Sequence, residues 1–340
     1  MVSSGAMWVS WPQVSLLVWV LVLFKVGGAF NASQELDTLI LFRKYIFMGI
    51  YWEEDDQAGR MTGKIEFEQN CLWESWNEID KSPCAWFGIS CTSDGSVRAI
   101  DLPGCNLQFS DSTFEDGSRG LRGLENLQQF RLTGSYIGGI NFTESLCTLV
   151  SLQELDLSDG SLVEDLPDCL NQLGNLRHLH LDGNFFRGSI PRLDNLTKLQ
   201  VFSISRNKLS GPIGSHLNDL VSLVDLDLSS NHFSGSIPLL TNLVNLKNLN
   251  INNNNLIGFE DPAFPGPQNL TRLLASGNQL QGTLPVGIVQ MLQLEVINMS
   301  FNQFTGEIPE GIIRQVERSF WLDLSNNQLG GSCRGTHSYQ

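Results

Sequence analysis

Apolar residues recur in a fixed pattern over most of the chain. Starting at Leu176, the sequence reads Leu-x-x-Leu-x-Leu-x-x-Asn-x-Phe-x-Gly-x-Ile-Pro, and this copy ends at Pro191. The pattern starts again every 23 or 24 residues, at Leu199, Leu223, Leu246, Leu270 and Leu294. One such turn of chain cannot bury its own leucines, so successive turns must stack on one another. A fixed period in the twenties therefore predicts a solenoid.

Each turn contains a Leu-x-Leu segment and, three residues later, an asparagine. Because side chains alternate along a strand, Leu-x-Leu predicts a short strand with its leucines facing inward. The asparagines are expected to point inward and to bond backbone groups, since an unpaired buried amide costs about 1 to 3 kcal/mol. The predicted ladder consists of Asn184, Asn207, Asn231, Asn254, Asn278, Asn302 and Asn327. The first turns have Cys105, Ser135 and Gly160 at the same position.

The leucine and asparagine spacing resembles that of leucine-rich repeats. The segments Gly188 to Pro191, Gly235 to Pro238 and Gly306 to Pro309 are similar to the plant-specific class of these repeats. The resemblance implies an α/β solenoid, a right-handed curved array with a parallel concave β-sheet and a helical N-terminal cap. It assigns about ten repeats to residues 97–332 and a second short strand after each turn. Gly258-Phe-Glu-Asp interrupts the pattern and predicts a bulge.

The N-terminus has the composition of a secretory signal. The first thirty residues contain no Asp or Glu, and the apolar run from Val14 to Phe24 is followed by small residues up to Ala29. We therefore predict a cleaved signal peptide over residues 1–29, with an uncleaved anchor as the alternative. Later stretches fall short of the ~18 to 20 apolar residues of a membrane helix. The expected location is extracellular, in the apoplast or cell wall, or at the cell surface in a longer membrane-anchored form.

Five N-glycosylation acceptor sequences are candidate glycan sites if the chain enters the secretory route. They begin at Asn31, Asn141, Asn195, Asn269 and Asn298.

Residues 30–96 do not repeat and are expected to cap the solenoid. A short helix is predicted around Asp37 and Leu41, and Cys84-Ala-Trp-Phe-Gly-Ile-Ser-Cys91 follows later. This segment resembles the N-terminal cap of plant leucine-rich-repeat receptors, which implies a disulfide between Cys84 and Cys91. The acidic segment Glu53 to Asp56 lies in an insertion relative to that family. A disordered insertion is the preferred interpretation, and an exposed acidic docking loop is the alternative.

Seven cysteines in a secreted chain indicate disulfides and one cysteine left over. Cys147 and Cys169 occupy positions that are paired in plant receptor-like proteins, so a bond is one reading and two buried thiols are the other. The sequence does not assign partners to Cys71, Cys105 and Cys333. Residues 333–340 are predicted to be an unstructured tail at the end of a truncated array.

Charge and motifs argue against several classes of function. The chain has 21 Lys+Arg against 36 Asp+Glu, a formal net charge of −15. Nucleic acids and anionic membranes require clustered cations, so neither is an expected partner. Phosphate-loop, metalloprotease, serine-hydrolase and kinase motifs are missing from the sequence, so we predict no enzyme, no cofactor and no metal. His178 and His180 beside Asp156 are interpreted as ordinary solvated surface.

The residues beside the inward leucines are expected to form a concave recognition surface. Its central column is predicted to run Asp101, Arg131, Asp156, His180, Ser203, Asp227, Asn250, Leu274, Asn298 and Asp323. Apolar anchors among polar groups are typical of recognition surfaces, and Phe320 is one such residue. The candidate ligand-binding residues are Asp156, His178, His180, Val201, Ser203, Val224, Asp227, Asn250, Leu274, Val296, Phe301 and Trp321.

Taken together, the chain resembles the ectodomain of a plant receptor-like protein or receptor-like kinase. That resemblance implies binding of a peptide, protein or cell-wall-derived ligand in cell-surface signalling or defence. A co-receptor kinase would be the second partner, since this chain has no kinase motifs. One alternative is a secreted protein similar to polygalacturonase inhibitors, and another is a non-functional fragment of a receptor.

Overall fold

The computed structural model describes residues 52–55, 60–63, 82–105, 123–136, 146–261, 264, 266–312 and 321–330. Several predictions therefore lie outside the described residues. These are the signal peptide over 1–29, the helix around Asp37, the glycan acceptors Asn31 and Asn141, the side chain of Phe320, the cysteines Cys71 and Cys333, and the tail over 333–340.

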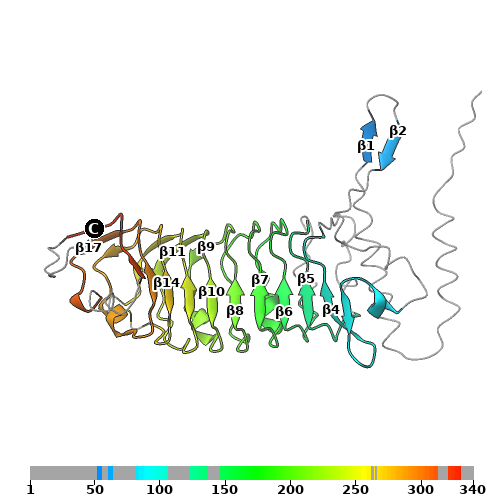
Figure 1. Ribbon diagram of the computed structural model, residues 1–340, viewed down its shortest axis with the longest axis horizontal. Helices are drawn as coiled ribbons and strands as arrows, with labels where there is room; N and C mark the ends of the chain where they lie inside the picture. Colours follow the sequence, from blue (N-terminus) through cyan, green and yellow to red (C-terminus); the bar gives the residue numbers. More distant parts are fainter. Residues whose placement is uncertain are drawn as a thin grey trace, which may run out of the picture.

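The described repeats stack into an elongated solenoid with one long sheet (Figure 1). Its 11 strands follow one another in chain order, apart from the second strands of the turns. β3 (Ile89–Cys91) pairs antiparallel with β4, and the remaining pairs are parallel. The ten parallel strands are β4 (Val97–Asp101), β5 (Gln129–Arg131), β6 (Glu154–Asp156), β7 (His178–His180), β8 (Val201–Ser203), β10 (Asp225–Asp227), β12 (Asn248–Asn250), β14 (Arg272–Leu274), β16 (Val296–Asn298) and β18 (Trp321–Asp323). The predicted curved α/β solenoid with a parallel concave sheet is confirmed.

The core lies on one side of this sheet and is continuous along the stack. In strands such as β6, β8 and β10 the middle residue is buried and its two neighbours are half-buried, as the alternation predicted. Phe130, Phe186, Phe202, Phe233 and Phe304 are fully buried between turns. Each such side chain contributes roughly 1.5 to 3 kcal/mol by leaving water. Because these contacts are made between neighbouring turns, stacking is the source of stability.

The asparagine ladder is confirmed. Asn207 shows the arrangement: its Nδ2 donates to the carbonyl oxygens of Leu181 at 2.9 Å and Ile204 at 3.1 Å. Its Oδ1 accepts from the N–H of Phe186 at 3.0 Å, so one side chain ties two turns together. The residue before each ladder position has a left-handed backbone, whether or not it is glycine: Gly104, Gly134, Asp159, Gly183, Arg206, Ser230, Asn253, Gly277, Phe301 and Asn326.

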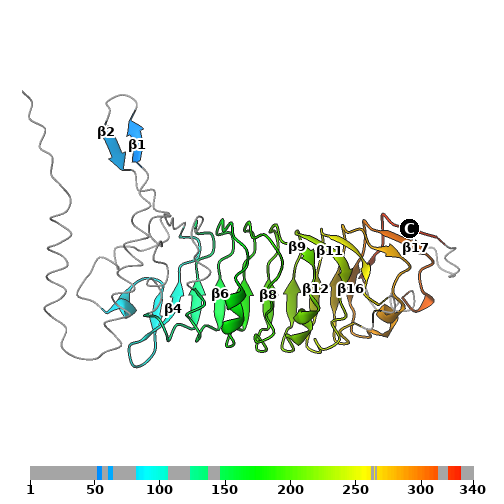
Figure 2. The same cartoon turned by 180° about the vertical axis from the view of Figure 1, so that it is seen from behind.

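Second strands follow the turns, as the plant-class resemblance implied. β9 (Ser210–Pro212), β11 (His232–Ile237) and β13 (Asn255–Phe259) form one three-stranded sheet. β15 (Gln281–Gly282), β17 (Gln303–Gly306) and β19 (Gln328–Leu329) form another. In both whole-molecule views these strands run along one edge of the stack (Figure 2). The predicted bulge is confirmed, because the β11–β13 register shifts so that Ser236 faces Gly258.

Short 3-10 helices complete the turns, and disulfides reinforce the first ones. The helices are η2 (Pro83–Ala85), η4 (Asp168–Gln172), η5 (Ser215–Asp219) and η6 (Val286–Gln290). The bond between Cys84 and Cys91 is present, with Cα atoms 5.5 Å apart. Cys147 and Cys169 are also bonded, with Cα atoms 5.7 Å apart, which decides between the two readings. Cys105 is disulfide-bonded as well.

The acidic insertion differs from the disordered segment that the sequence predicted. Trp52–Asp55 forms strand β1, and Arg60–Gly63 forms strand β2. The two strands pair antiparallel, with Glu53 opposite Thr62 and Asp55 opposite Arg60. The prediction was wrong for these eight residues because it weighed the acidic run and missed that the two four-residue segments can pair with each other.

Candidate ligand-binding face

The register of the long sheet places two outward residues of each strand in columns across the concave face. The second column contains Asp101, Arg131, Asp156, His180, Ser203, Asp227, Asn250, Leu274, Asn298 and Asp323. This is the predicted central column. The first column contains Ala99, Gln129, Glu154, His178, Val201, Asp225, Asn248, Arg272, Val296 and Trp321.

Ten of the twelve candidate residues lie in these two columns, and two do not. Val224 stands one residue before β10, where its carbonyl accepts from the N–H groups of Lys247 and Asn248. The residue in line with Val201 is Asp225. Phe301 lies in the turn after β16 rather than on the strand. The local pattern missed both placements because it does not fix where a three-residue strand begins and ends.

Many polar residues of the second column also cap the end of their strand. Asp156 Oδ1 accepts from the N–H of Ser158 at 2.9 Å, and Asp227 Oδ1 accepts from Ser229 at 2.9 Å. The same contact is made by Asn250, Asn298 and Asp323. An Asp or Asn side chain that bonds the backbone two residues on stabilises a turn. These residues therefore have a structural role besides any contact with a ligand.

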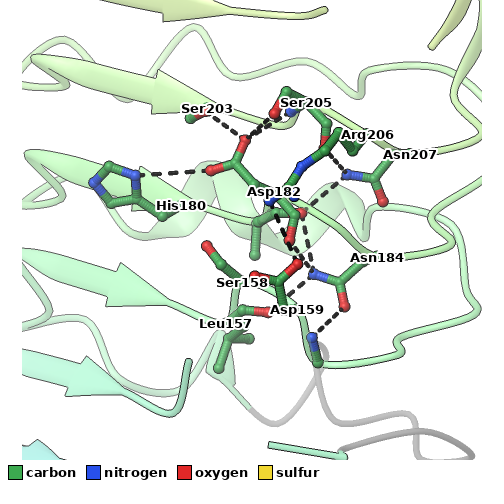
Figure 3. A network of polar contacts seen from close by, with 12 residues as sticks. Leu157, Ser158, Asp159, His180, Asp182, Asn184, Ser203, Ser205, Arg206 and Asn207 are labelled. Atoms are coloured by element: carbon green, nitrogen blue, oxygen red, sulfur yellow. Dashed lines mark hydrogen bonds and ion pairs between the residues drawn. The ribbon is translucent and has the colours of Figure 1, made fainter. Parts of the chain in front are cut away.

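Where the second column lacks Asp or Asn, the preceding repeat can supply the cap. Ser203 occupies the column in β8, and the N–H of Ser205 is bonded instead by Asp182 Oδ1 at 2.8 Å (Figure 3). Asp182 also accepts from the hydroxyls of Ser203 and Ser205, and its Oδ2 lies 3.9 Å from Nδ1 of His180. Asp182 was not among the residues predicted from the sequence to lie at the site. Its signal was a carboxylate two residues before Asn184, where most other repeats have serine.

A second cap that is supplied by the preceding repeat lies further along the array. Leu274 occupies the second column in β14, and Asn252 Oδ1 of the preceding repeat bonds the N–H of Ser276 at 2.7 Å. Asp101 has the carboxylate for such a cap but no backbone donor to bond, because Pro103, two residues later, has no N–H. Its buried Oδ1 has no hydrogen-bond partner among the described residues.

Arg131 on β5 lies among acidic side chains of the neighbouring strands. Arg131 lies 2.6 Å from Glu154 and 3.3 Å from Asp101. Burial by itself lowers the pKa of Arg131, but the hydrogen bond and charge of Glu154, with the charges of Asp101 and Asp156, raise it overall. At the far end of the face, hydrogen bonds from the hydroxyl and N–H of Ser325 hold the pKa of Asp323 below its usual value. Arg131 is thus already neutralised within the fold.

The C-terminal part of the face presents apolar side chains beside the polar residues Arg272, Asn298 and Asp323. Trp321 pairs in register with Val296, and its side chain is 51% exposed. Leu274 lies one strand before Val296 and is half-buried. Phe301 is 60% exposed and has a left-handed backbone with φ of 52°, which is unfavourable for a bulky residue. These side chains are available for contact with another molecule.

In the described part of the chain, groups of three or more His, Cys, Asp or Glu that could hold a metal ion are absent. None of the helices in the same ranges combines the length and hydropathy of a membrane crossing. Of the glycan acceptors, Asn195 and Asn269 are exposed outside the long sheet, whereas Asn298 lies half-buried on the concave face. Their occupancy stays a prediction.

A family model described as a leucine-rich repeat region matches residues 89–308. The chain belongs to the leucine-rich-repeat proteins. Among curated relatives, this leucine-rich-repeat chain is 29% identical over 143 residues to a probable LRR receptor-like serine/threonine-protein kinase, RPK1, of Arabidopsis thaliana. That match covers 42% of this chain and 25% of the relative. The chain thus spans a quarter or less of the length of the first curated relatives it matches.

Solved structures of plant receptors share the fold of this leucine-rich-repeat chain. The LRR ectodomain of the receptor kinase GASSHO1/SCHENGEN3 from Arabidopsis thaliana, in complex with CASPARIAN STRIP INTEGRITY FACTOR 2, superposes with a TM-score of 0.71 at 28% identity. The match covers 86% of this chain and 32% of that one. The plant peptide hormone receptor RGFR1 in complex with RGF2 matches at 33% identity with a TM-score of 0.56, over 62% and 38% of the two chains. The suspected relationship to plant receptor ectodomains is thereby confirmed.

Proposed function

We propose that this chain is an extracellular recognition module that binds a peptide or protein ligand on its concave face, in cell-surface signalling or defence. The observation that carries the proposal is the long sheet itself. Its ten parallel strands, spaced ~4.8 Å apart, form a face roughly 40 Å long with polar columns and exposed apolar side chains at one end. An extended ligand matches this shape. The similar ectodomain of GASSHO1/SCHENGEN3 was solved in complex with CASPARIAN STRIP INTEGRITY FACTOR 2, and the peptide hormone receptor RGFR1 was solved in complex with RGF2, which supports ligand binding here.

Binding without catalysis is the second part of the proposal. The acidic residues of the face are engaged in capping contacts, as Asp156 and Asp227 show. A signalling kinase would be supplied by a co-receptor or by a longer form of the protein. We expect the ligand to be an extended peptide, since exposed apolar anchors such as Trp321 beside polar groups are typical of protein-recognition surfaces.

Selection from a displayed library of random linear peptides tests this function. Binding peptides are expected to slow hydrogen exchange in β6 to β16. The substitution Ser203→Trp, which fills the middle of the face, is expected to weaken binding at least about tenfold, or about 1.4 kcal/mol. The matched control is Val244→Trp, because Val244 is 55% exposed and lies outside the long sheet.

Two results would contradict the proposal. One is that selected peptides bind Ser203→Trp as well as they bind the unchanged protein. The other is that the protein inhibits fungal polygalacturonases at nanomolar concentration, which would favour the alternative of a secreted inhibitor. A second control is the thermal unfolding of each variant, which must stay cooperative so that a loss of binding is not mistaken for a loss of folding.

A further inference from the structure

Charge and apolar surface are distributed along the concave face at regular intervals. We infer that the face selects an extended peptide with two basic side chains about four residues apart and a large apolar side chain about four residues further on. This inference rests on the proposed function, because it names the ligand chemistry of the same face.

Two of the ten parallel strands are acidic in both outward columns. They are β6, with Glu154 and Asp156, and β10, with Asp225 and Asp227. The strands between them present His178 and His180 on β7, and Val201 on β8. The two acidic strands are therefore separate sites for positive charge rather than one continuous acidic surface.

The fold leaves most of this charge without a cation. Arg131 forms an ion pair with Glu154, and its charge also interacts with that of Asp156. Asp156 and Asp227 each accept a backbone N–H, and Asp225 and Asp227 accept from the amides of Asn248 and Asn250. None of the ion pairs found between described residues includes Asp156, Asp225 or Asp227. Neutral donors do not cancel a charge, so Lys or Arg of a ligand complements these carboxylates.

The apolar site lies at the same interval again. β6 and β10 are three strand steps apart, and so are β10 and β16. Three steps of ~4.8 Å amount to about 14 Å, which is about four residues of an extended chain at ~3.4 Å each. Val296 on β16 and Trp321 beside it on β18 form the apolar site. An extended peptide that crosses the strands thus meets the acidic site on β6 first, then the acidic site on β10, and then the apolar site on β16 and β18.

Synthetic peptides of 14 residues test this order of side chains. One probe has Lys at positions 3 and 7 and Trp at position 11 in a Ser/Gly background, and a second has the reverse order because the face does not fix chain direction. The controls are a probe with Glu in place of Lys and a probe with the three residues adjacent. We expect one of the two directions to bind at least about tenfold more tightly than both controls, as measured by fluorescence anisotropy at low and moderate salt.

Paired substitutions locate the binding. The double variant Asp225→Asn and Asp227→Asn keeps the side-chain oxygens that accept hydrogen bonds but removes two charges. This double variant is expected to bind the Lys-containing probe about threefold to thirtyfold more weakly. Asp168→Asn with Asp219→Asn removes the same two charges from η4 and η5, outside the long sheet, and is expected to change binding less than twofold. Trp321→Ala is compared in the same way with Leu292→Ala, since Leu292 is 75% exposed away from the sheet.

The outcomes separate this inference from the proposed function. Equal binding of the spaced and the adjacent probes, or equal loss in the two double Asp variants, would overturn the inference. If library peptides of other chemistry still lose binding with Ser203→Trp, the proposed function stands without it. If no library peptide is sensitive to Ser203→Trp, both fail together.

Discussion

At the scale of single residues, position within the turn decides what a polar side chain does. Asn254 and Asn255 are neighbours of the same type, yet Asn254 is buried and Asn255 is exposed. Asn254 Nδ2 donates to the carbonyls of Leu228 and Ile251, and its Oδ1 accepts from the N–H of Phe233. Removing such a side chain leaves several buried backbone groups without a partner.

This pair gives a matched test of the ladder. Asn254→Ala is expected to lower the free energy of unfolding by about 2 to 4 kcal/mol, because more than one buried group loses its hydrogen bond. Asn255→Ala is expected to change it by less than about 0.5 kcal/mol, as usual for surface substitutions. Urea unfolding measures both. Similar losses in the two variants would show that the ladder is not what stabilises the turn.

The cap supplied across repeats can be tested by rescue. Asp182→Ala is expected to cost about 1 to 2 kcal/mol, since the N–H of Ser205 loses its acceptor. Adding Ser203→Asp is expected to recover most of that loss, because Asp227 makes the same contact to Ser229 within its own repeat. Ser203→Asp alone serves as the control and is not expected to stabilise, since it places a carboxylate beside Asp182. Failure of the rescue would mean that Asp182 acts through another contact.

At the scale of elements, each three-residue strand is too short to be stable without its neighbours. Single repeats are held by the strands on either side, and stability is close to a sum of repeat and interface contributions. The disulfide between Cys147 and Cys169 reinforces this arrangement early in the array, across a separation of 22 residues. Its effect should therefore be confined to the turns around β6 and β7.

Removal of that disulfide is a test of local stabilisation. Replacing Cys147 and Cys169 together by Ala is expected to cost about 3 kcal/mol, because an open loop of this size gains entropy in the unfolded chain. Hydrogen exchange is expected to rise in β6 and β7 and to stay unchanged in β14 and β16. A uniform rise over all strands would indicate instead that the whole array unfolds as one cooperative unit.

At the scale of the whole molecule, net charge acts in opposite directions on folding and on binding. The chain has a formal charge of −15, so compact packing brings like charges together. Salt shortens the range of this repulsion, from roughly 30 Å at 0.01 M to about 10 Å at 0.1 M. The same screening weakens attraction between the acidic strands and a basic ligand.

A salt series tests this opposition. Raising NaCl from about 10 mM to about 300 mM is expected to increase the melting temperature by a few degrees, because repulsion is screened. Affinity for the Lys-containing probe is expected to fall over the same range. The control is the double variant Asp168→Asn and Asp219→Asn, whose melting temperature should respond less to salt. A melting temperature that decreases with salt would show that attractive ion pairs, such as those of Arg131, outweigh the net repulsion.

Local sequence patterns predicted the repeating parts of the fold well and the irregular parts poorly. Leu-x-Leu, the ladder asparagines and the Gly-x-Ile-Pro segments each repeat, so errors in one copy are corrected by the others. The segment Trp52–Asp55 occurs once, so its pairing with Arg60–Gly63 has no second copy in the chain that could have indicated it. Val224 was misplaced for a related reason, because the start of a three-residue strand is fixed by its neighbours' hydrogen bonds.

The sequence by itself determined that this protein is a stack of turns with buried leucines and asparagines, since a side-chain period and a burial requirement suffice for that conclusion. Only the tertiary structure decided which outward residues are left for a ligand. Asp182 and Asn252 cap strands of the following repeat, so Ser203 and Leu274 do not have to. Such exchanges occur between residues more than 20 positions apart, and only the register of stacked strands brings them together.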